Sequence, residues 1–306
     1  MSDSRPVRAE AFAPAHVTGV FSPSMAARDP RARGSTGAGI VLELGVYATA
    51  EFRPGRPRRV RLSSDLNIPL PISENVARRL APRTQGDLAV HLTHQLPVGQ
   101  GFGMSAAAAA ATSLAVGALS SRPRSKVFEV AHLADLYGGG GLGGVAAIVG
   151  GGGLEYRSRA GVPPYGRTLH RPLGGQILIG LTGGPLPSPR LLRRPRFLER
   201  VENAGDGLAD LLRHPDSDRF FRLSERFTDR MGLAPPSLFR LLKALRRRRA
   251  WAAQAMFGRS FFVRPRTAES RRDVVRWFET AGVPALELSP ARRGARLLRT
   301  SRPHGP

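Results

Sequence analysis

A glycine-rich segment, Leu96–Met104, leads directly into a run of small residues and constrains the fold of this chain more than any other feature. Its alternating glycines let the backbone turn sharply and approach a ligand without interference from Cβ atoms. The alanines that follow Ser105 predict a slim helix over residues 105–120 that can pack closely against its neighbours. Because the free amides and the dipole of a helix N-terminus attract anions, the segment predicts a phosphate-binding loop.

Two well-known phosphate loops do not match this segment. The Gly-Lys-Ser/Thr ending of a Walker A loop is absent, and the glycine spacing does not fit a dinucleotide fingerprint. The structural alternative is a tight turn ahead of a buried alanine helix, and we favour phosphate binding over it. Ser105 lies in the first helical turn, where its hydroxyl can reach a phosphate-bound Mg²⁺ or cap the helix.

Length and composition limit the protein classes. The 306 residues suffice for two domains, and 41% hydrophobic residues provide for real cores. There is no apolar run of 18 residues and no apolar leader at the N-terminus, so we expect a soluble, cytoplasmic protein without a membrane partner. The chain has no cysteine, which excludes disulfides, zinc–thiolate sites and thiol nucleophiles.

The net charge is +24, and most of the positive charge is arginine. Such a charge attracts anions, among them nucleotides, phosphorylated metabolites and nucleic acid. The arginine-rich helix predicted over residues 240–249 has only Trp251 nearby as a base-stacking aromatic. We therefore favour a solvated arginine-rich surface, and we do not expect a nucleic-acid partner.

Strand-like and helix-like segments follow one another in each half, which predicts an α+β chain of two domains. We expect an N-terminal domain over residues 1–170, a C-terminal domain over 171–290 and an arginine-rich, disordered tail over 291–306. The helices predicted in the second half cover residues 191–212, 219–231, 237–256 and 270–281.

Pro97–Ala107 resembles the Pro-x-x-x-Gly-x-Gly-x-Ser-Ser-Ala-Ala motif of the GHMP kinase superfamily, in the Gly-Gln-Gly-Phe-Gly-Met-Ser variant of archaeal pantoate kinases. Residues 13–21, 34–39 and 253–262 resemble other motifs of those kinases, in the same order. The resemblance implies the two-domain GHMP kinase fold. Its N-terminal domain is like the second domain of a ribosomal protein, and its C-terminal domain is ferredoxin-like. It also implies ATP and Mg²⁺ as cofactors and a possible homodimer.

The resemblance assigns roles to individual residues. Ala131–Asp135 is similar to an Ala-His-x-Ala-Glu segment whose carboxylate holds Mg²⁺, so Ser105 and Asp135 are the predicted metal ligands. The predicted nucleotide-binding residues are Pro97, Gly99, Gln100, Gly101, Phe102, Gly103, Met104, Ser105 and Ala106. The predicted acceptor-binding residues are His16, Thr18, Ser35 and Gly258, and the predicted catalytic residues are His16, Thr18 and Ser105.

One position departs from the family pattern. Gly139–Ala147 resembles the Gly-Thr-Gly-Leu-Gly-Asp-Val-Val-Ala of pantoate kinases, but the Asp, the active-site carboxylate that the resemblance implies, falls on Gly144. Phosphoryl transfer depends mainly on positioning and charge neutralisation. General-base help contributes about 10²–10⁴-fold, so we expect kinase activity to be retained without this carboxylate.

The resemblance implies an ATP-dependent small-molecule kinase that phosphorylates pantoate to 4-phosphopantoate, in coenzyme A biosynthesis. The alternatives are a GHMP kinase for homoserine, shikimate or mevalonate, and a degenerate nucleotide-binding protein without turnover. An acceptor carboxylate requires a cation or amide donors, and the candidates near the 34–39 motif are Arg28, Arg31 and Arg33. His91, His94 and His132 are interpreted as structural.

Overall fold

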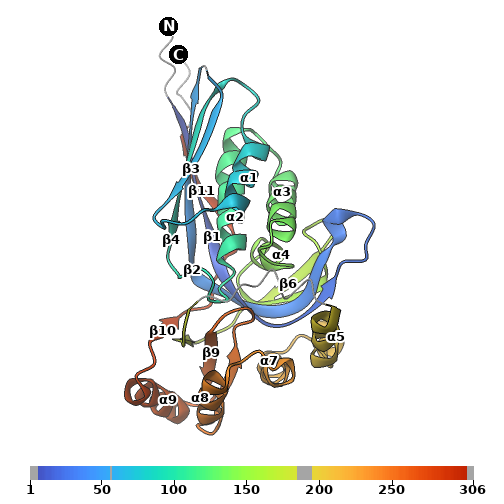
Figure 1. The fold of residues 1–306 in the computed structure, drawn as a ribbon, viewed down its shortest axis with the longest axis vertical. Helices are drawn as coiled ribbons and strands as arrows, with labels where there is room; N and C mark the ends of the chain where they lie inside the picture. The colour runs from blue at the N-terminus through green and yellow to red at the C-terminus, as the bar shows by residue number, and fades with distance from the viewer. Residues whose placement is uncertain (1–5, 56, 185–194, 302–306) are drawn as a thin grey trace.

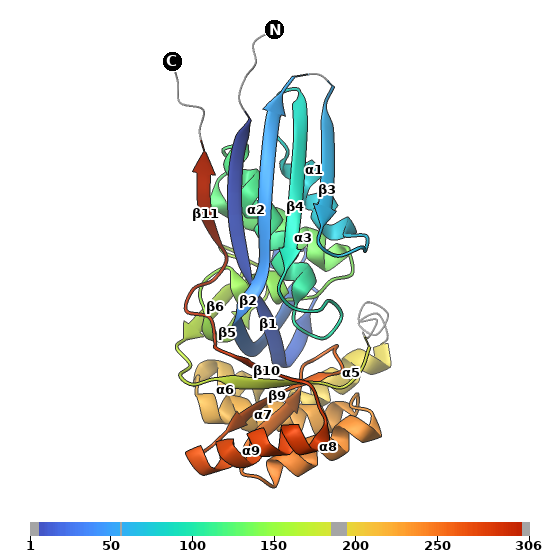
Figure 2. The ribbon, with the colours of Figure 1, turned by 90° about the vertical axis from the view of Figure 1, so that its left-hand side faces the viewer.

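The computed structural model describes residues 6–55, 57–184 and 195–301, and these residues form two β-sheets (Figure 1). Helices cover one face of each sheet, and Figure 2 shows the strands of the larger sheet in front of their helices. The described chain is thus α+β, as the sequence predicts. None of its helices is long and apolar enough to span a membrane.

The larger sheet has seven strands in the order β11-β1-β2-β4-β3, and β5 and β6 extend it from β2. Its neighbouring strands are antiparallel, except for the parallel pair β3 and β4. The strands are β1 (Val7–Ser24), β2 (Gly34–Pro54), β3 (Arg59–Ser64), β4 (Gly86–His94), β5 (Gly153–Arg159), β6 (Arg167–Arg171) and β11 (Arg296–Ser301). The helical segments with this sheet are η1 (Pro30–Ala32), α1 (Pro71–Leu80), α2 (Met104–Leu119), α3 (Arg124–Tyr137) and α4 (Gly144–Ile148).

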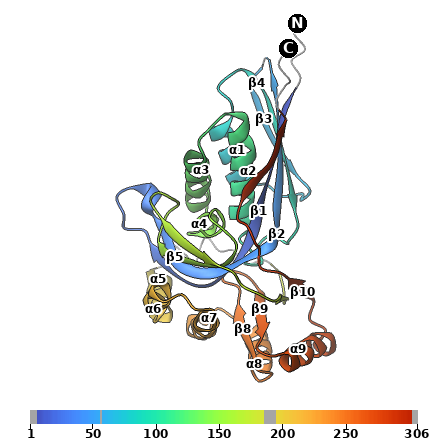
Figure 3. The same cartoon turned by 180° about the vertical axis from the view of Figure 1, so that it is seen from behind.

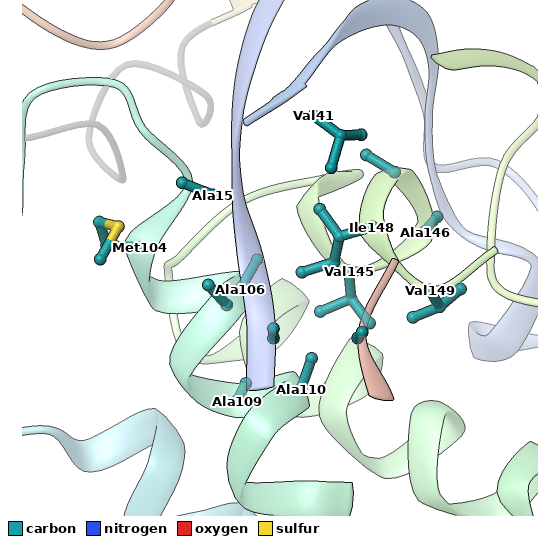
Figure 4. Close-up of a cluster of buried hydrophobic side chains, with 14 of the residues drawn as sticks. Ala15, Val41, Met104, Ala106, Ala109, Ala110, Val145, Ala146, Ile148 and Val149 are labelled. Atoms are coloured by element: carbon teal, nitrogen blue, oxygen red, sulfur yellow. The ribbon is translucent and has the colours of Figure 1, made fainter. Parts of the chain in front are cut away.

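Helix α2 lies at the centre of this half because its side chains are small. It is buried along nearly its whole length, and it contacts β1, β2, α1, α3 and α4. Figure 4 shows the side chains of Ala106, Ala109 and Ala110 beside those of Val145 and Ile148 from α4. Methyl groups on α2 allow this close approach, and the packing holds the helix N-terminus in a fixed position.

The smaller sheet has four antiparallel strands in the order β10-β7-β9-β8. With its crossover helices this is the ferredoxin-like β-α-β-β-α-β arrangement that the resemblance implies. The strands are β7 (Ile177–Leu181), β8 (Ala250–Gln254), β9 (Ser260–Pro265) and β10 (Ala285–Leu288). The helices are α5 (Pro195–Ala204), α6 (Leu208–Arg213), α7 (Ser217–Met231), α8 (Pro236–Arg246) and α9 (Ala268–Ala281).

Two of the predicted helices were wrong in extent. The helix expected over 237–256 ends at Arg246, and residues 250–254 form β8, which pairs with β9. The backbone turns at Arg249, which has a left-handed φ of 53°, and strand pairing then overrides the helical preference of the alanines. The helix expected over 191–212 splits into α5 and α6 at Gly207, where φ is 94°, while residues 191–194 lie outside the described residues.

The tail predicted to be disordered, residues 291–306, contains strand β11, so this prediction was wrong for the residues that form the strand. β11 pairs antiparallel with β1, with Arg8 opposite Ser301. The Arg299 guanidinium also contacts the Glu10 carboxylate at 2.7 Å. Pairing with the edge of β1 and these local contacts order a segment whose composition alone suggests disorder. Residues 302–306 lie outside the described residues.

Strands β1 and β2 are long and strongly curved, and they connect the two halves of the molecule. Their lower parts pass between α4 and the smaller sheet, as the view from behind shows (Figure 3). The pairing of β1 with β2 shifts register between Pro14 and His16 and again between Thr18 and Val20. Such irregularities redirect side chains, and here they flank the two predicted acceptor-binding residues of β1.

Candidate active site

A pocket lies where the glycine-rich loop before α2, the glycine segment 139–144 and strand β1 meet. Met256 and Phe257, from the turn between β8 and β9, close one side of it. Most of the predicted site residues line this pocket, namely His16, Thr18, Ser35, Gly99, Gly101, Phe102, Gly103, Met104, Ser105, Ala106 and Asp135. The structure therefore brings together residues from β1, β2, α2 and α3.

The loop has the backbone conformation that its glycines predict. Gly99, Gly101 and Gly103 have φ values of 79°, 84° and 61°, in the left-handed region that favours glycine. A Cβ atom on Gly101 would lie 3.0 Å from the carbonyl oxygens of Ala255 and Met256, which leaves little space for a side chain. Gly103 is the N-cap of α2 and has no side chain to satisfy the first amides of the helix. Those amides remain available to an anion in the pocket.

Ser105 and Asp135 meet on the wall of the pocket. The Ser105 hydroxyl donates a hydrogen bond of 2.8 Å to Oδ1 of Asp135, which is 1% exposed. Burial raises the pKa of Asp135 to about 7, although hydrogen bonds from Ser105 and from the Gly141 backbone oppose the shift. Gly140 packs against this carboxylate so closely that a Cβ atom there would lie 1.9 Å from Oδ1.

This pair fits a Mg²⁺ ion that is held jointly with nucleotide phosphates. The described residues contain no cluster of three His, Asp or Glu side chains that could bind a metal by themselves. Mg²⁺ bound through one carboxylate and a substrate phosphate needs no such cluster, because phosphate and water oxygens complete its shell. The hydroxyl and carboxylate oxygens are hard ligands of the kind that Mg²⁺ prefers.

A buried group of three charged or titratable side chains lies on the opposite wall. His16 Nε2 lies 2.8 Å from Oε1 of Glu155, and the same oxygen accepts a hydrogen bond from Nη1 of Arg157. The three residues are 3%, 0% and 1% exposed. Gly39 makes room for the imidazole, because a Cβ atom there would lie 2.3 Å from Nε2.

Burial and charge set the ionisation of this group. Burial lowers the pKa of His16, which outweighs the opposing effect of the hydrogen bond with Glu155. Burial alone would raise the pKa of Glu155, but the Arg157 charge and the hydrogen bond with His16 outweigh it and lower that pKa. At neutral pH the arrangement is therefore a neutral imidazole, a carboxylate and a guanidinium.

Sequence reasoning missed Glu155 and Arg157. Arg157 lines the pocket, whereas Arg31 is paired with Asp29, and Arg33 donates to backbone carbonyl oxygens in its own loop. A signal was present, because a glutamate and an arginine two residues apart in a strand share one face. Opposite charges two residues apart, flanked by Leu154 and Tyr156, are compatible with a buried pair.

Three predicted site residues do not line the pocket: Pro97, Gln100 and Gly258. The Gln100 amide donates a hydrogen bond of 2.6 Å to the Gly183 carbonyl oxygen, away from the ligand space. A Cβ atom on Gly258 would lie 1.9 Å from the Gln100 carbonyl oxygen. Gly258 thus packs directly behind the loop, and its acceptor-binding role stays a prediction. His132 is buried, and its Nε2 lies 2.9 Å from the Arg33 carbonyl oxygen, consistent with a structural residue.

Comparison with known proteins shows which proteins the chain is similar to. The model of the GHMP kinases N terminal domain matches residues 71–152. The pantoate kinases of Methanospirillum hungatei JF-1 and Thermococcus kodakarensis are 29% and 28% identical to this chain, over 86% of it and 89% of each relative. A solved structure described as a phosphotransferase related to the CoA biosynthesis pathway is 25% identical, with a TM-score of 0.83 over 96% of this chain and 99% of that one.

The chain is therefore similar to GHMP kinases along nearly its whole length. The predicted family resemblance and the predicted two-domain fold class are thereby confirmed.

The structure has a distinct arrangement at Gly144, the first residue of α4. A Cβ atom there would lie 2.6 Å from Cβ of Ala106 and 3.8 Å from Oδ2 of Asp135. The Ala106 methyl group thus occupies part of the space that a side chain at 144 requires. The departure from the family pattern is accommodated by the packing of α2 against α4.

Proposed function

We propose that this chain is a pantoate kinase, which transfers the γ-phosphoryl group of ATP to the hydroxyl of pantoate and forms 4-phosphopantoate. The pantoate kinase relatives support this acceptor, because they match nearly the whole chain. The observation that carries the proposal is the buried Arg157 guanidinium in the pocket. Glu155 pairs with this guanidinium, but its Nε is left without a partner in the described chain, which suits an acidic acceptor better than an uncharged alcohol.

Arg157 supports an acid as the acceptor. Glu155 binds its Nη1, while its Nε has no hydrogen-bond partner among the described residues. Ser35 lies beside it, because a Cβ atom on Gly143 would touch both Ser35 Oγ at 2.5 Å and Arg157 Nε at 2.8 Å. A guanidinium and a hydroxyl so placed can bind a carboxylate. Homoserine, shikimate and mevalonate also carry carboxylates, and the similarity to pantoate kinases supports pantoate among these acids.

The opposite wall suits the nucleotide. The free amides at the start of α2 would bind ATP phosphates, and Ser105 with Asp135 would hold Mg²⁺ against them. When bound, Mg²⁺ neutralises the charge that develops on the phosphates. The residues of this chain then position the acceptor: Thr18 and Ser35 offer hydroxyls, and Arg157 binds the carboxylate.

The acceptor is tested with purified protein by following ADP formation with pantoate, homoserine, shikimate and mevalonate, each with Mg²⁺ and ATP. We expect the highest kcat/KM with pantoate, and the ³¹P spectrum of the product should show a phosphate monoester. A higher kcat/KM with another acid would reassign the substrate, and no turnover with any of the four would contradict the kinase assignment.

Replacing Arg157 with glutamine should weaken acceptor binding far more than nucleotide binding. Hydrogen bonds to charged groups contribute about 1.5–3 kcal/mol, so the KM for pantoate should rise by about 10–100-fold. The KM for pantoate of Arg157→Lys, which keeps the charge, should lie between those of Arg157→Gln and the wild type. Arg159→Gln is the matched control, since Arg159 lies two residues further along β5 and is exposed. An unchanged KM for pantoate in Arg157→Gln would remove Arg157 from the acceptor site.

Binding of Mg²⁺ should strengthen as the pH rises towards 7. The metal requires the ionised form of Asp135, whose pKa is raised to about 7, so protons compete with Mg²⁺ below that pH. At pH 6 the apparent affinity should be about tenfold weaker than its plateau above pH 8. Calorimetric titration of Mg²⁺ with a non-hydrolysable ATP analogue measures this, after subtraction of Mg²⁺ binding to the free analogue. A pH-independent affinity after that subtraction would exclude Asp135 as a ligand.

A further inference from the structure

The acceptor hydroxyl must lose a proton when it is phosphorylated, and Gly144 provides no group to accept it. A side chain added at 144 would meet the Ala106 methyl group at 2.6 Å. The fold therefore does not hold an open space for a carboxylate at this position. Another group of the pocket takes the proton, or the proton passes directly to water.

Only one side chain of the described pocket lining is free to act as a base. The ionisable residues that line the pocket are His16, Asp135 and Arg157. Asp135 is placed for the metal, and an arginine guanidinium does not lose its proton in a protein. His16 is left, on strand β1 between two register shifts that turn it towards the pocket.

Glu155 holds His16 in the tautomer that a base requires. The Glu155 carboxylate is fully buried and paired with Arg157, so it is ionised and accepts a hydrogen bond from Nε2–H of His16. The proton on Nε2 leaves Nδ1 unprotonated. Nδ1 forms no hydrogen bond within the described chain, and the atom keeps some solvent-accessible surface. A carboxylate behind an imidazole also stabilises the imidazolium that forms when the second nitrogen takes a proton.

We propose that His16, oriented by Glu155, is the general base of this kinase and takes the place of the carboxylate that is missing at Gly144. The inference rests on the proposed kinase activity. As the acceptor oxygen bonds to the γ-phosphorus, the bond from that phosphorus to the β,γ-bridging oxygen breaks and ADP leaves. The hydroxyl proton passes to Nδ1 of His16, and the imidazolium returns it to water after the phosphorylated product departs. His16 is then a catalytic residue, and Glu155 is a positioning residue.

The charged and titratable groups that face His16 are few. Glu155 and Arg157 lie on β5, and His170 lies on β6 directly opposite Glu155. Gly39 of β2 lies against the imidazole, and Gly103 of the phosphate loop lies against the His16 backbone and Cβ; neither residue titrates. Burial keeps the pKa of His16 below its usual value of 6.5, so the base form predominates at neutral pH.

The test compares His16→Gln with the matched control His170→Gln, at saturating ATP, pantoate and Mg²⁺. In the wild type, kcat should fall as the pH drops through the pKa of His16, because protonation removes the base. His16→Gln should lower kcat by about 10²–10⁴-fold and abolish this acidic limb, while binding of a non-hydrolysable ATP analogue stays unchanged. His170→Gln should keep both kcat and the limb, since His170 does not line the pocket. A His16→Gln enzyme with wild-type kcat and pH profile would overturn the proposal.

A second measurement uses the wild-type protein, so it does not depend on whether a variant folds. The ¹⁵N spectrum of the imidazoles should show His16 protonated at Nε2 and unprotonated at Nδ1 near neutral pH, and the opposite tautomer would overturn the role of Glu155. In Glu155→Gln the acidic limb should move to lower pH, because the imidazolium loses its carboxylate partner. If the wild type phosphorylates none of the four acids, the proposed function fails and this inference fails with it. If it phosphorylates pantoate and His16→Gln is equally fast, only this inference fails.

Discussion

Asp135→Asn is expected to abolish phosphoryl transfer and, at the same time, to make the unliganded protein more stable. The substitution removes the charge that would hold Mg²⁺ but keeps an oxygen that can accept the Ser105 hydrogen bond. Activity should fall by about 10³-fold or more, since metal-assisted charge neutralisation carries most of this chemistry.

The gain in stability follows from the direction of the pKa shift. The carboxyl has a pKa of 3.8 in the unfolded chain and about 7 in the folded one, because burial penalises the charged form. The folded state therefore loses stability as the pH rises from 3.8 towards 7, and the full penalty is present above 7. One pKa unit corresponds to about 1.4 kcal/mol, so asparagine should raise the free energy of unfolding by a few kcal/mol at pH 8.

Denaturant unfolding of both proteins at pH 5 and pH 8 measures this effect. The difference in the free energy of unfolding should be largest at pH 8 and about a third as large at pH 5, where only the part of the penalty that accumulates between pH 3.8 and 5 is present. Saturating Mg²⁺ with an ATP analogue should stabilise the wild type and leave the variant unchanged. A variant that is less stable than the wild type at pH 8 would show that the ionised carboxylate is well solvated in the folded protein.

Gly144→Asp is expected to destabilise the protein and not to improve the enzyme, although it restores the residue of the family pattern. The new Cβ atom would lie 2.6 Å from that of Ala106, and both residues sit on packed helices with no flexible side chain to move aside. Overpacking of this kind costs about 1–3 kcal/mol. Gly141→Asp is the matched control, because a Cβ atom there has only the ordinary contact of 3.6 Å with Asp135 Oδ2.

The double variant Ala106→Gly, Gly144→Asp separates the clash from the charge. Removal of the methyl group should recover much of the stability that Gly144→Asp loses, even though Ala106→Gly alone costs about 1 kcal/mol in a helix. A double-mutant cycle from thermal or denaturant unfolding gives the coupling between the two sites. Additive effects would mean that Ala106 does not occupy the space of a side chain at 144.

The parts of the site that local sequence encodes could be predicted. Alternating glycines before an alanine run specify the left-handed turns and the helix start after Gly103, and the φ values in the structure agree. The pairing of Ser105 with Asp135 followed from the family resemblance, and the structure places the two side chains in hydrogen-bond contact. Features of this kind can be predicted from a short stretch of sequence or from a family motif.

The parts that depend on distant pairing could not be predicted in the same way. Glu155 and Arg157 become site residues only because β5 pairs with β2, which brings them behind His16 on β1. Likewise, the alanines around residue 252 favour a helix, and pairing with strand β9 overrides this preference. Arg31 and Arg33 lie near the 34–39 motif in sequence, but their guanidinium groups donate hydrogen bonds to acceptors within their own loop.

Strand β11 has a consequence for the order in which the protein can assemble. It belongs to the larger sheet, yet it is synthesised after every element of the smaller one. While the ribosome is still making the smaller sheet, the outer edge of β1 is without its neighbour and exposes hydrogen-bonding groups. Completion of the larger sheet therefore requires prior synthesis of the ferredoxin-like half. The two halves form separate sheets, but the larger sheet is completed only after the smaller one has been synthesised. The protein therefore cannot be divided at residue 170 into two parts that fold independently.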